Sequence, residues 1–219
     1  MAETPLASPI PPTPPASRNR LIEAAARVYA CAGFRGATTR RIAEEAGVNE
    51  VTIFRLFGSK AALIDAAVRQ HAGAEAEPLV ALPDEPVAPE SELTAWCETQ
   101  LGLLRERRSL IRQSMGELAE RPEIGPCVAE GTSHAAAELK RYMRRLYEGG
   151  FVEDASRRRE GRDEEAHAAG AMLMAALFGD AMGRDLMPEM YPQPADRAAS
   201  LYVRLFLRAI RCAPSRPQG

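Results

Sequence analysis

The sequence predicts an all-α protein, with a small helical unit near the N-terminus and a larger helical region after it. Only 5% of its 219 residues are aromatic, and no run of Val, Ile or Thr alternates with polar residues as it would in a strand. Apolar residues recur instead at three- and four-residue spacing between Gly- and Pro-rich breaks. Because 46% of the chain is hydrophobic, it can fill a helical core.

Residues 1–16 are rich in proline and contain neither the basic nor the apolar segment of a signal peptide, so they are predicted to form a disordered arm. An apolar helix is predicted next, over residues 21–32. No apolar run in the chain approaches the ~20 residues that span a bilayer. We therefore expect a cytoplasmic protein that does not enter a membrane, and its separated cysteines fit reduced thiols.

Residues 38–60 carry the most informative pattern, TTRRIAEEAGVNEVTIFRLFGSK. A short helix is predicted over residues 39–45, with Ile42 and Ala46 facing the core. Gly47 follows it, where a left-handed backbone would cost a residue with a Cβ about 1 kcal/mol or more. A short helix, a glycine turn and a second helix are typical of a DNA-reading helix-turn-helix.

The second helix of this motif is predicted to begin after Asn49, a good N-cap residue. Ile53, Leu56 and Phe57 recur at helical spacing and are expected to bury its inner face. A recognition helix presents its N-terminal residues to base edges in the major groove. The DNA-binding candidates here are Asn49 at the start of the helix and, on its outward side, Glu50, Val51, Thr52, Phe54 and Arg55.

Hydroxyl and basic side chains occur together at two of the predicted helix starts in this region. Thr39, Arg40 and Arg41 open the first helix of the motif, whereas Ser59 and Lys60 open the helix after it. Helix N-termini and positive charges both bind phosphate, so these residues are predicted to position the DNA backbone. The local charge agrees, because residues 17–71 hold nine Arg or Lys against five Asp or Glu in a chain of net charge −2.

The same stretch resembles the TetR family of transcriptional regulators. The resemblance rests on the apolar helix at 21–32, the Gly33-Phe34 corner, the Thr38-Thr39 pair and the Gly58-Ser59-Lys60 ending. It implies a three-helix DNA-binding domain followed by a helical domain that binds a small effector and forms a homodimer. A two-fold dimer requires a palindromic operator in double-stranded DNA.

Two positions depart from the family's pattern. Phe54 stands where the family generally has a tyrosine whose hydroxyl contacts a phosphate, so that contact should be missing. Glu50 places an acid at the start of the recognition helix, where it would repel phosphate. It either accepts a hydrogen bond from a cytosine amine or serves the helix dipole.

Prolines and glycines divide the rest of the chain. A connector helix is predicted over residues 60–74, and the proline-rich stretch 76–90 follows it as a loop. The predicted domains are a proline-rich arm at 1–16, a DNA-binding domain at 17–75 and an effector-binding and dimerisation domain at 76–219. Further helices are predicted over residues 91–107, 110–119, 132–148, 163–182 and 195–211.

The last two predicted helices are apolar on more than one face, and such helices must bury both faces. In the family they pair with their two-fold mates, which favours a homodimer through these helices over two internal helices of a monomer. The effector is expected to be apolar or amphipathic, although Met residues at helical spacing are more often core than pocket. The residues predicted to line its pocket are Trp96, Leu101, Met115, Tyr142, Met143 and Met172.

Patterns of catalytic or metal chemistry are weak in this sequence. His71, His134 and His167 lack the spacing of a metal site, and there is no nucleophile elbow or phosphate-cradling loop. We therefore predict no enzyme activity, no metal and no cofactor. Three hypotheses stay open: a repressor released by a small ligand, a regulator of the same fold without one (an activator or a protein-controlled regulator), and an enzyme or scaffold with a vestigial helix-turn-helix.

Overall fold

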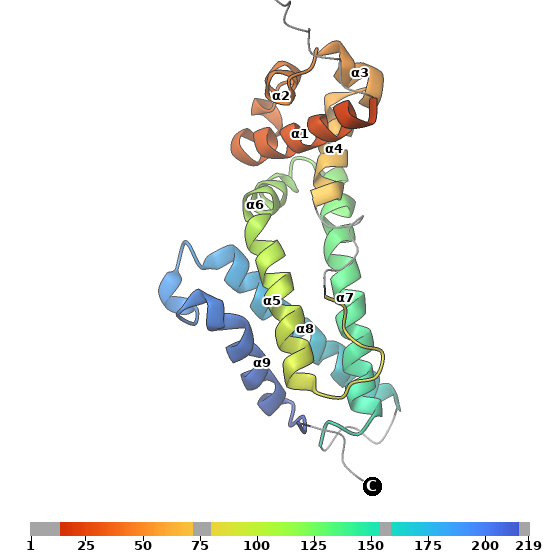
Figure 1. Ribbon diagram of the computed structural model, residues 1–219, viewed down its shortest axis with the longest axis vertical. Coiled ribbons are helices and arrows are strands. Elements are labelled where there is room, and N and C mark those ends of the chain that lie inside the picture. The colour runs from red at the N-terminus through yellow and green to blue at the C-terminus, as the bar shows by residue number, and fades with distance from the viewer. Residues whose placement is uncertain (1–13, 72–79, 154–158, 215–219) are drawn as a thin grey trace, which may run out of the picture.

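The computed structural model describes residues 14–71, 80–153 and 159–214, apart from the side chains of residues 14, 130–132 and 159. The described residues form helices joined by turns, and their extended pairing is limited to one isolated bridge between Val152 and Cys212. The all-α prediction is confirmed. In Figure 1, a small helical head lies at one end of an elongated molecule and adjoins a larger helical body. Within the described ranges, no helix combines the length and apolar character needed to cross a bilayer.

The head consists of α1 (Pro14–Gly36), α2 (Thr39–Ala46), α3 (Val51–Phe57) and α4 (Lys60–His71). α1 packs against both α2 and α4, and α3 packs against α4. Helical periodicity directs one apolar side of each helix toward the others. The largest fully buried side chains of this core are Leu21, Ile22, Tyr29, Ile42, Ile53, Leu63 and Ile64.

The first helix is longer than the predicted range of 21–32. Residues 14–16, which were assigned to the disordered arm, form its first turn. A helix tolerates proline there because the N–H groups of its first turn have no intrahelical partners. The other residues of the predicted arm lie outside the described residues, as does the predicted domain boundary between residues 75 and 76.

The described part of the body comprises five α-helices and short 3₁₀ turns. α5 packs against α8 and α9, and α7 packs along α8 (Figure 1). Its core includes Trp96, Tyr142, Leu146, Phe151 and Leu177, all nearly or fully buried. The helices are α5 (Pro89–Glu106), α6 (Arg108–Glu117), α7 (Gly125–Glu148), α8 (Arg159–Gly183) and α9 (Ala198–Ala209), and the turns are η1 (Pro122–Ile124), η2 (Pro188–Met190) and η3 (Ala195–Arg197).

Four body helices, α5 to α8, begin earlier than predicted, and in α5 and α7 the reason is local. α5 begins at Pro89 because Glu92 Oε1 accepts hydrogen bonds from the N–H groups of Val87, at 3.0 Å, and Ala88, at 2.9 Å. This side chain caps the helix start in place of Ser91. α7 begins at Gly125 rather than residue 132, since a proline in its first turn costs no helical hydrogen bond. α7 ends at Glu148 as predicted, because Gly150, which follows the C-cap residue Gly149, has a left-handed backbone (φ 75°).

A buried carboxylate connects α7 to the elements around it. Glu138 Oε2 accepts a hydrogen bond from Trp96 Nε1 at 2.8 Å, and Glu138 Oε1 accepts one from the Leu82 N–H at 2.7 Å. Trp96 is fully buried and Glu138 is 5% exposed. The single tryptophan is therefore a core residue whose polar N–H has a dedicated partner.

The head and the body share part of one core. Leu110 of α6, Ile124 of η1 and Cys127 of α7 are buried in the same cluster as the head residues. α1 packs along α6, and α4 packs against α7. The head is therefore seated on the body through apolar packing of two of its helices.

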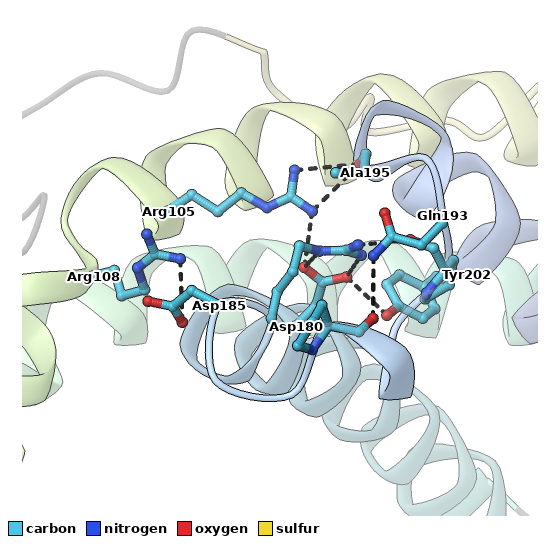
Figure 2. A network of polar contacts seen from close by, with 10 residues as sticks. Arg105, Arg108, Asp180, Asp185, Gln193, Ala195 and Tyr202 are labelled. Atoms are coloured by element: carbon cyan, nitrogen blue, oxygen red, sulfur yellow. Dashed lines mark hydrogen bonds and ion pairs between the residues drawn. The ribbon is translucent and has the colours of Figure 1, made fainter.

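A second buried carboxylate, Asp180, lies at the centre of a network of polar contacts among α5, α8 and α9 (Figure 2). It is fully buried near the end of α8 and accepts hydrogen bonds from Arg105 of α5 at 2.8 Å and from the Tyr202 hydroxyl of α9 at 2.9 Å. Arg184, one turn further along the chain, pairs with both oxygens. Arg105 also donates to the Ala195 carbonyl at 3.3 Å. One side chain therefore holds α5, α8, α9 and the segment before α9 together.

The next carboxylate along, Asp185, binds α6. Arg112 Nη1 donates to Asp185 Oδ2 at 3.0 Å, and Arg108 Nη1 lies 3.5 Å from Asp185 Oδ1. Arg112 also donates to the Met182 carbonyl. The outer face of α6 is thus attached to the end of α8 by charge-assisted hydrogen bonds.

Replacement of Asp180 is expected to destabilise the fold in a pH-dependent way. Burial raises the pKa of Asp180, but hydrogen bonds from Arg184, Arg105 and Tyr202 outweigh it and leave the pKa below its ordinary value. The ionised carboxylate therefore stabilises the protein at neutral pH, and this contribution is lost as the pH falls through the acid range below about 4.

We predict that Asp180→Ala lowers the free energy of unfolding by about 3 kcal/mol at pH 7, because it leaves two arginines without their carboxylate. Urea unfolding followed by circular dichroism measures the difference, which should shrink as the pH approaches 3. Asp196→Ala removes an exposed carboxylate and is the matched control. An equal effect of both substitutions would contradict the role of Asp180.

Candidate DNA-binding surface and internal cavity

The turn between α2 and α3 has the predicted geometry. Thr38 caps α2 by accepting a hydrogen bond from the Arg41 N–H at 3.3 Å. Gly47 ends it in the left-handed region, at φ 62° and ψ 41°. The Gly47 N–H donates to the Glu44 carbonyl and the Val48 N–H to the Ala43 carbonyl, at 3.2 and 3.0 Å. These bonds satisfy carbonyls that the end of a helix leaves free.

The recognition helix α3 exposes the side that the sequence predicts. The Val51 N–H donates to Asn49 Oδ1 at 2.9 Å, so Asn49 caps the start of the helix. Ile53 is fully buried beneath it, whereas Val51 is 70% and Phe54 51% exposed. Glu50 and Arg55 are also exposed, and Thr52 is half-buried. An exposed apolar surface on a short helix is consistent with contact to base edges.

Glu50 joins the starts of the two motif helices. Its carboxylate accepts a hydrogen bond from the Thr39 hydroxyl. Next to it, Arg40 Nε donates to Glu44 Oε1 at 2.9 Å on the exposed side of α2. Glu50, which is predicted to read bases, is therefore hydrogen-bonded to Thr39, which is predicted to bind phosphate. DNA has to compete with this hydrogen bond in order to contact either side chain.

Ser59 and Lys60, the two residues predicted to contact phosphate at the start of α4, make different contacts within the protein. Ser59 Oγ accepts a hydrogen bond from the Ala62 N–H at 3.1 Å and so caps α4. Lys60 Nζ donates to the Phe34 carbonyl at 2.8 Å and lies 4.1 Å from the centroid of the Phe34 ring. Arg41 Nη1 likewise donates to the Gly36 carbonyl at 2.9 Å. Lys60 and Arg41 thus stabilise the corner between α1 and α2, a structural role that the sequence did not indicate.

A contact between the head and α6 was not foreseen from the sequence. Glu117 accepts hydrogen bonds from the Tyr29 hydroxyl at 2.8 Å and from the Phe34 N–H at 2.7 Å. Gln113 Nε2 donates to the same carboxylate at 2.9 Å. Burial, with a further contribution from Glu117 and against a lowering by the Ser114 hydroxyl, raises the pKa of Tyr29 to about 12. The tyrosine therefore stays a hydrogen-bond donor throughout the neutral range.

Glycine at position 33 makes this contact possible. Gly33 has φ 66° within α1, and a Cβ built on it would lie 2.7 Å from Glu117 Oε1 and 2.8 Å from Gln113 Nε2. Any side chain would combine an unfavourable backbone with a steric clash. The Gly33-Phe34 pair was recognised in the sequence as a corner, but its partners lie more than eighty residues away, as the separation of 83 between Phe34 and Glu117 shows.

Arg121 extends the same junction toward α4. Its guanidinium carbon lies 3.7 Å from the centroid of the Phe34 ring, and its Nη2 donates to Asp65 Oδ1 at 3.2 Å. Arg121 Nε also donates to Glu123 Oε1 at 3.0 Å. A cation above an aromatic ring with a paired carboxylate is favourable when partly desolvated. The segment after α6 is therefore bound to both α1 and α4.

Directly beneath the head, the body contains a cavity of about 560 Å³. It lies among α5, α6, α7 and α8 and reaches Val68 and His71 at the end of α4. Its volume is within the range of small-molecule sites. The apolar part of its wall includes Leu103, Leu110, Ile111, Val128, Met174 and Phe178.

The residues predicted to line an effector pocket do not gather around this cavity. Trp96, Leu101, Tyr142 and Met143 are buried in the body core instead. Met115 and Met172 lie on the surface, with exposed fractions of 45% and 51%. Helical spacing identifies the inward side of a helix, but it does not distinguish a packed core from a cavity on the same side. The six residues predicted to bind an effector are therefore not among those that line this cavity.

A capped two-helix motif with an exposed recognition helix and neighbouring arginines defines this chain as a helix-turn-helix DNA-binding transcriptional regulator. Residues 21–67 match the family described as bacterial regulatory proteins, tetR family. This match lies in the DNA-binding head and supports a regulator of the TetR type.

Similar proteins support this assignment over most of the chain. The uncharacterized HTH-type transcriptional regulator YvkB of Bacillus subtilis (strain 168) is 26% identical over 195 residues, which cover 89% of this chain and 97% of YvkB. A solved structure from Pseudomonas aeruginosa PAO1 is 23% identical with a TM-score of 0.71 and covers 90% of this chain and 91% of its own. The TetR transcriptional regulator from Agrobacterium tumefaciens is 18% identical with a TM-score of 0.67, covering 88% and 93%. The two structures show a shared fold.

Arg55 is predicted to contribute to sequence preference through α3. Arg55→Ala should reduce the preference for the operator over single-base variants by about 1–3 kcal/mol if the guanidinium reaches a base edge. The measurement compares dissociation constants for an operator selected from random DNA and for its variants at one salt concentration. Arg204→Ala, which removes an exposed arginine from α9, is the control. A uniform loss on all sequences would assign Arg55 to the phosphate backbone instead.

Proposed function

We propose that this protein is a homodimeric repressor that leaves its operator when a small apolar or amphipathic molecule occupies the cavity. The observation that carries this proposal is the place of the cavity, which lies among the body helices and reaches Val68 and His71 of α4. α4 leads directly out of the helix-turn-helix. A ligand in the cavity would contact the head and the body at once.

α6 offers the connection between ligand and operator. Leu110, Ile111 and Ser114 line the cavity from this helix, and Glu117, one turn beyond Ser114, accepts the hydrogen bonds from Tyr29 and Phe34. A ligand that binds better when α6 is displaced would shift the protein away from its DNA-binding state, typically with a coupling of about 1–3 kcal/mol. Tight binding without such a preference would not release the operator.

Dimerisation through α8 and α9 is part of the proposal. Met172 of α8 is 51% and Leu205 of α9 is 60% exposed, and the small residue Ala168, one turn before Met172, is exposed as well. Small residues permit the close approach of another helix, and large apolar ones supply buried area. A two-fold dimer would recognise an inverted repeat, in the cytoplasm where the operator is.

The alternative is a regulator of this fold that uses no small ligand and acts as an activator or under the control of another protein. Footprinting that reveals an inverted repeat supports the dimer, and asymmetric sites alone contradict it. A screen of hydrophobic compounds with operator release as the readout separates the two regulators. A saturable, sequence-specific gel shift excludes the third hypothesis, a vestigial motif on an enzyme or scaffold.

The proposed dimer predicts that Leu205→Glu dissociates the protein into monomers. A charge at an apolar helix contact is costly to desolvate, so dimers should be weakened by about 2 kcal/mol or more per interface. Sedimentation equilibrium at micromolar concentration measures the change. Val87→Glu places the same charge at a residue that is 71% exposed outside α8 and α9, and it should leave the dimer intact. A wild-type monomer would contradict the proposal directly.

The proposed ligand site predicts that filling the cavity abolishes induction. Ala135 of α7 lines the cavity and is half-buried, so Ala135→Trp should occupy it and weaken effector binding at least tenfold, by about 1.4 kcal/mol or more. Operator affinity and operator release are measured by fluorescence anisotropy. Ala137→Trp, on the exposed side of the same helix, is the control. Equal release from both variants would place the effector elsewhere.

A further inference from the structure

The ionisable residues that line the cavity are all of the basic type. They are His71 of α4, Arg107 between α5 and α6, Lys140 of α7 and His167 of α8. No Asp or Glu occurs among the described residues of the wall. The rest of the chain is acidic on balance, since its net charge is −2 while the head is basic. A wall of one sign of charge is therefore a local property and sets the potential inside the cavity.

Arg107 stands out from the arginines near it. Arg105 pairs with Asp180, and both Arg108 and Arg112 pair with Asp185. Arg107 is half-buried at the wall of the cavity, and it has no ion pair with any other residue that the structure describes. Half-buried guanidinium groups are usually satisfied by carboxylates or hydrogen-bond acceptors. Asp180 and Asp185 are thus committed to other arginines, and Arg107 lines the cavity without a carboxylate partner among the described residues.

The other basic residues of the wall differ in their partners. His71 Nε2 lies 3.3 Å from Glu23 Oε2, so a carboxylate of α1 already accompanies it. Lys140 and His167 are exposed, and neither is paired within the described ranges. They lie along α7 and α8 beside Ala136 and Ala171, which are also exposed, and these residues form the open side of the cavity. An anion that approaches this side meets favourable charge before it reaches Arg107.

Building on the proposed repressor function, we propose that the cavity binds amphipathic anions. The ligand would have one apolar body and one carboxylate- or phosphate-type headgroup, with the headgroup on Arg107. The planar guanidinium forms two parallel hydrogen bonds to such groups. The apolar body lies against Leu103, Leu110, Ile111 and Phe178. Organic cations are disfavoured because the wall offers them no carboxylate.

The headgroup position also fits the proposed coupling. Arg107 is the single residue between the end of α5 at Glu106 and the start of α6 at Arg108. Its N–H donates to the Leu103 carbonyl at 3.1 Å, and its carbonyl accepts from the Ile111 N–H at 3.0 Å. An anion bound to this side chain therefore acts at the joint of the helix that contacts the head.

The test uses the full-length wild-type protein and four probes that share one alkyl chain: dodecanoate, dodecyl phosphate, dodecan-1-ol and dodecylammonium. Calorimetric titration without DNA, below the concentrations at which the probes form micelles, gives each dissociation constant. At least one anion should bind about tenfold or more tightly than the alcohol, which is the effect of one charge-assisted contact. The ammonium should bind more weakly than the alcohol. The tighter of the two anions identifies the headgroup as a carboxylate or a phosphate.

Arg107→Gln should reduce the preference for the anion over the alcohol to less than threefold, while binding of the alcohol is retained. Arg141→Gln, which neutralises an exposed arginine on the polar side of α7, should leave the preference unchanged. Should Arg107→Gln fail to fold, the wild-type protein is titrated at low and at high salt. The preference for the anion over the alcohol should fall as salt rises if it rests on charge, and an unchanged preference would contradict the anion site.

Failure of this inference is distinguishable from failure of the repressor function. Equal binding of anion and alcohol, tighter binding of the ammonium, or no binding of either anion would overturn the anion assignment. If neutral compounds nevertheless release operator DNA, the repressor proposal stands without it. If anions bind with the expected preference but never release DNA, the anion site stands and ligand-controlled repression does not.

Discussion

The Glu117 carboxylate accepts hydrogen bonds from the Tyr29 hydroxyl and the Phe34 N–H, and it is the point at which the head is held on the body. Apolar packing around Leu110 and Ile124 gives this junction most of its buried area, but packing alone is not directional. The carboxylate sets the register, because it satisfies a backbone N–H at the kink of α1. Gly33 is required for the same contact, so backbone conformation and charge placement constrain each other there.

The DNA-reading motif could be predicted closely from the sequence because its determinants are local. Gly47, Asn49 and Ile53 each act within one helical turn of their partners, through a left-handed cap, a side-chain cap and a buried face. The all-α class followed in the same way from periodicity and breakers. The junction at Glu117 and the network around Asp180 join residues far apart in the chain, as the separation of 75 between Arg105 and Asp180 illustrates. Their acids and arginines are indistinguishable in sequence from solvated ones.

The residues that line the cavity could not be predicted from the sequence, for a different physical reason. Helical periodicity places both Trp96 and Leu103 on the inward side of α5. Trp96 is buried and donates a hydrogen bond to Glu138 of α7, whereas Leu103 lines the cavity. Which of two inward residues meets a void depends on how neighbouring helices diverge, and that is set by contacts at their ends. In this protein those contacts include the arginine pairs of Asp180 and Asp185, which join α5, α6, α8 and α9, and Glu138, which joins α7 to α5.

The shared core of head and body has a consequence for the order in which the chain assembles. All buried residues of the head cluster occur by Cys127, whereas the body cluster draws on residues as late as Leu207. Since synthesis proceeds from the N-terminus, the operator-reading surface and its support in α6 and early α7 can form on the ribosome while α8 and α9 are still to be made. A chain that stops after Cys127 but before Asp180 keeps all the buried residues of the head cluster and lacks both Asp180 and α9. During synthesis of each molecule, the body is therefore completed after the head.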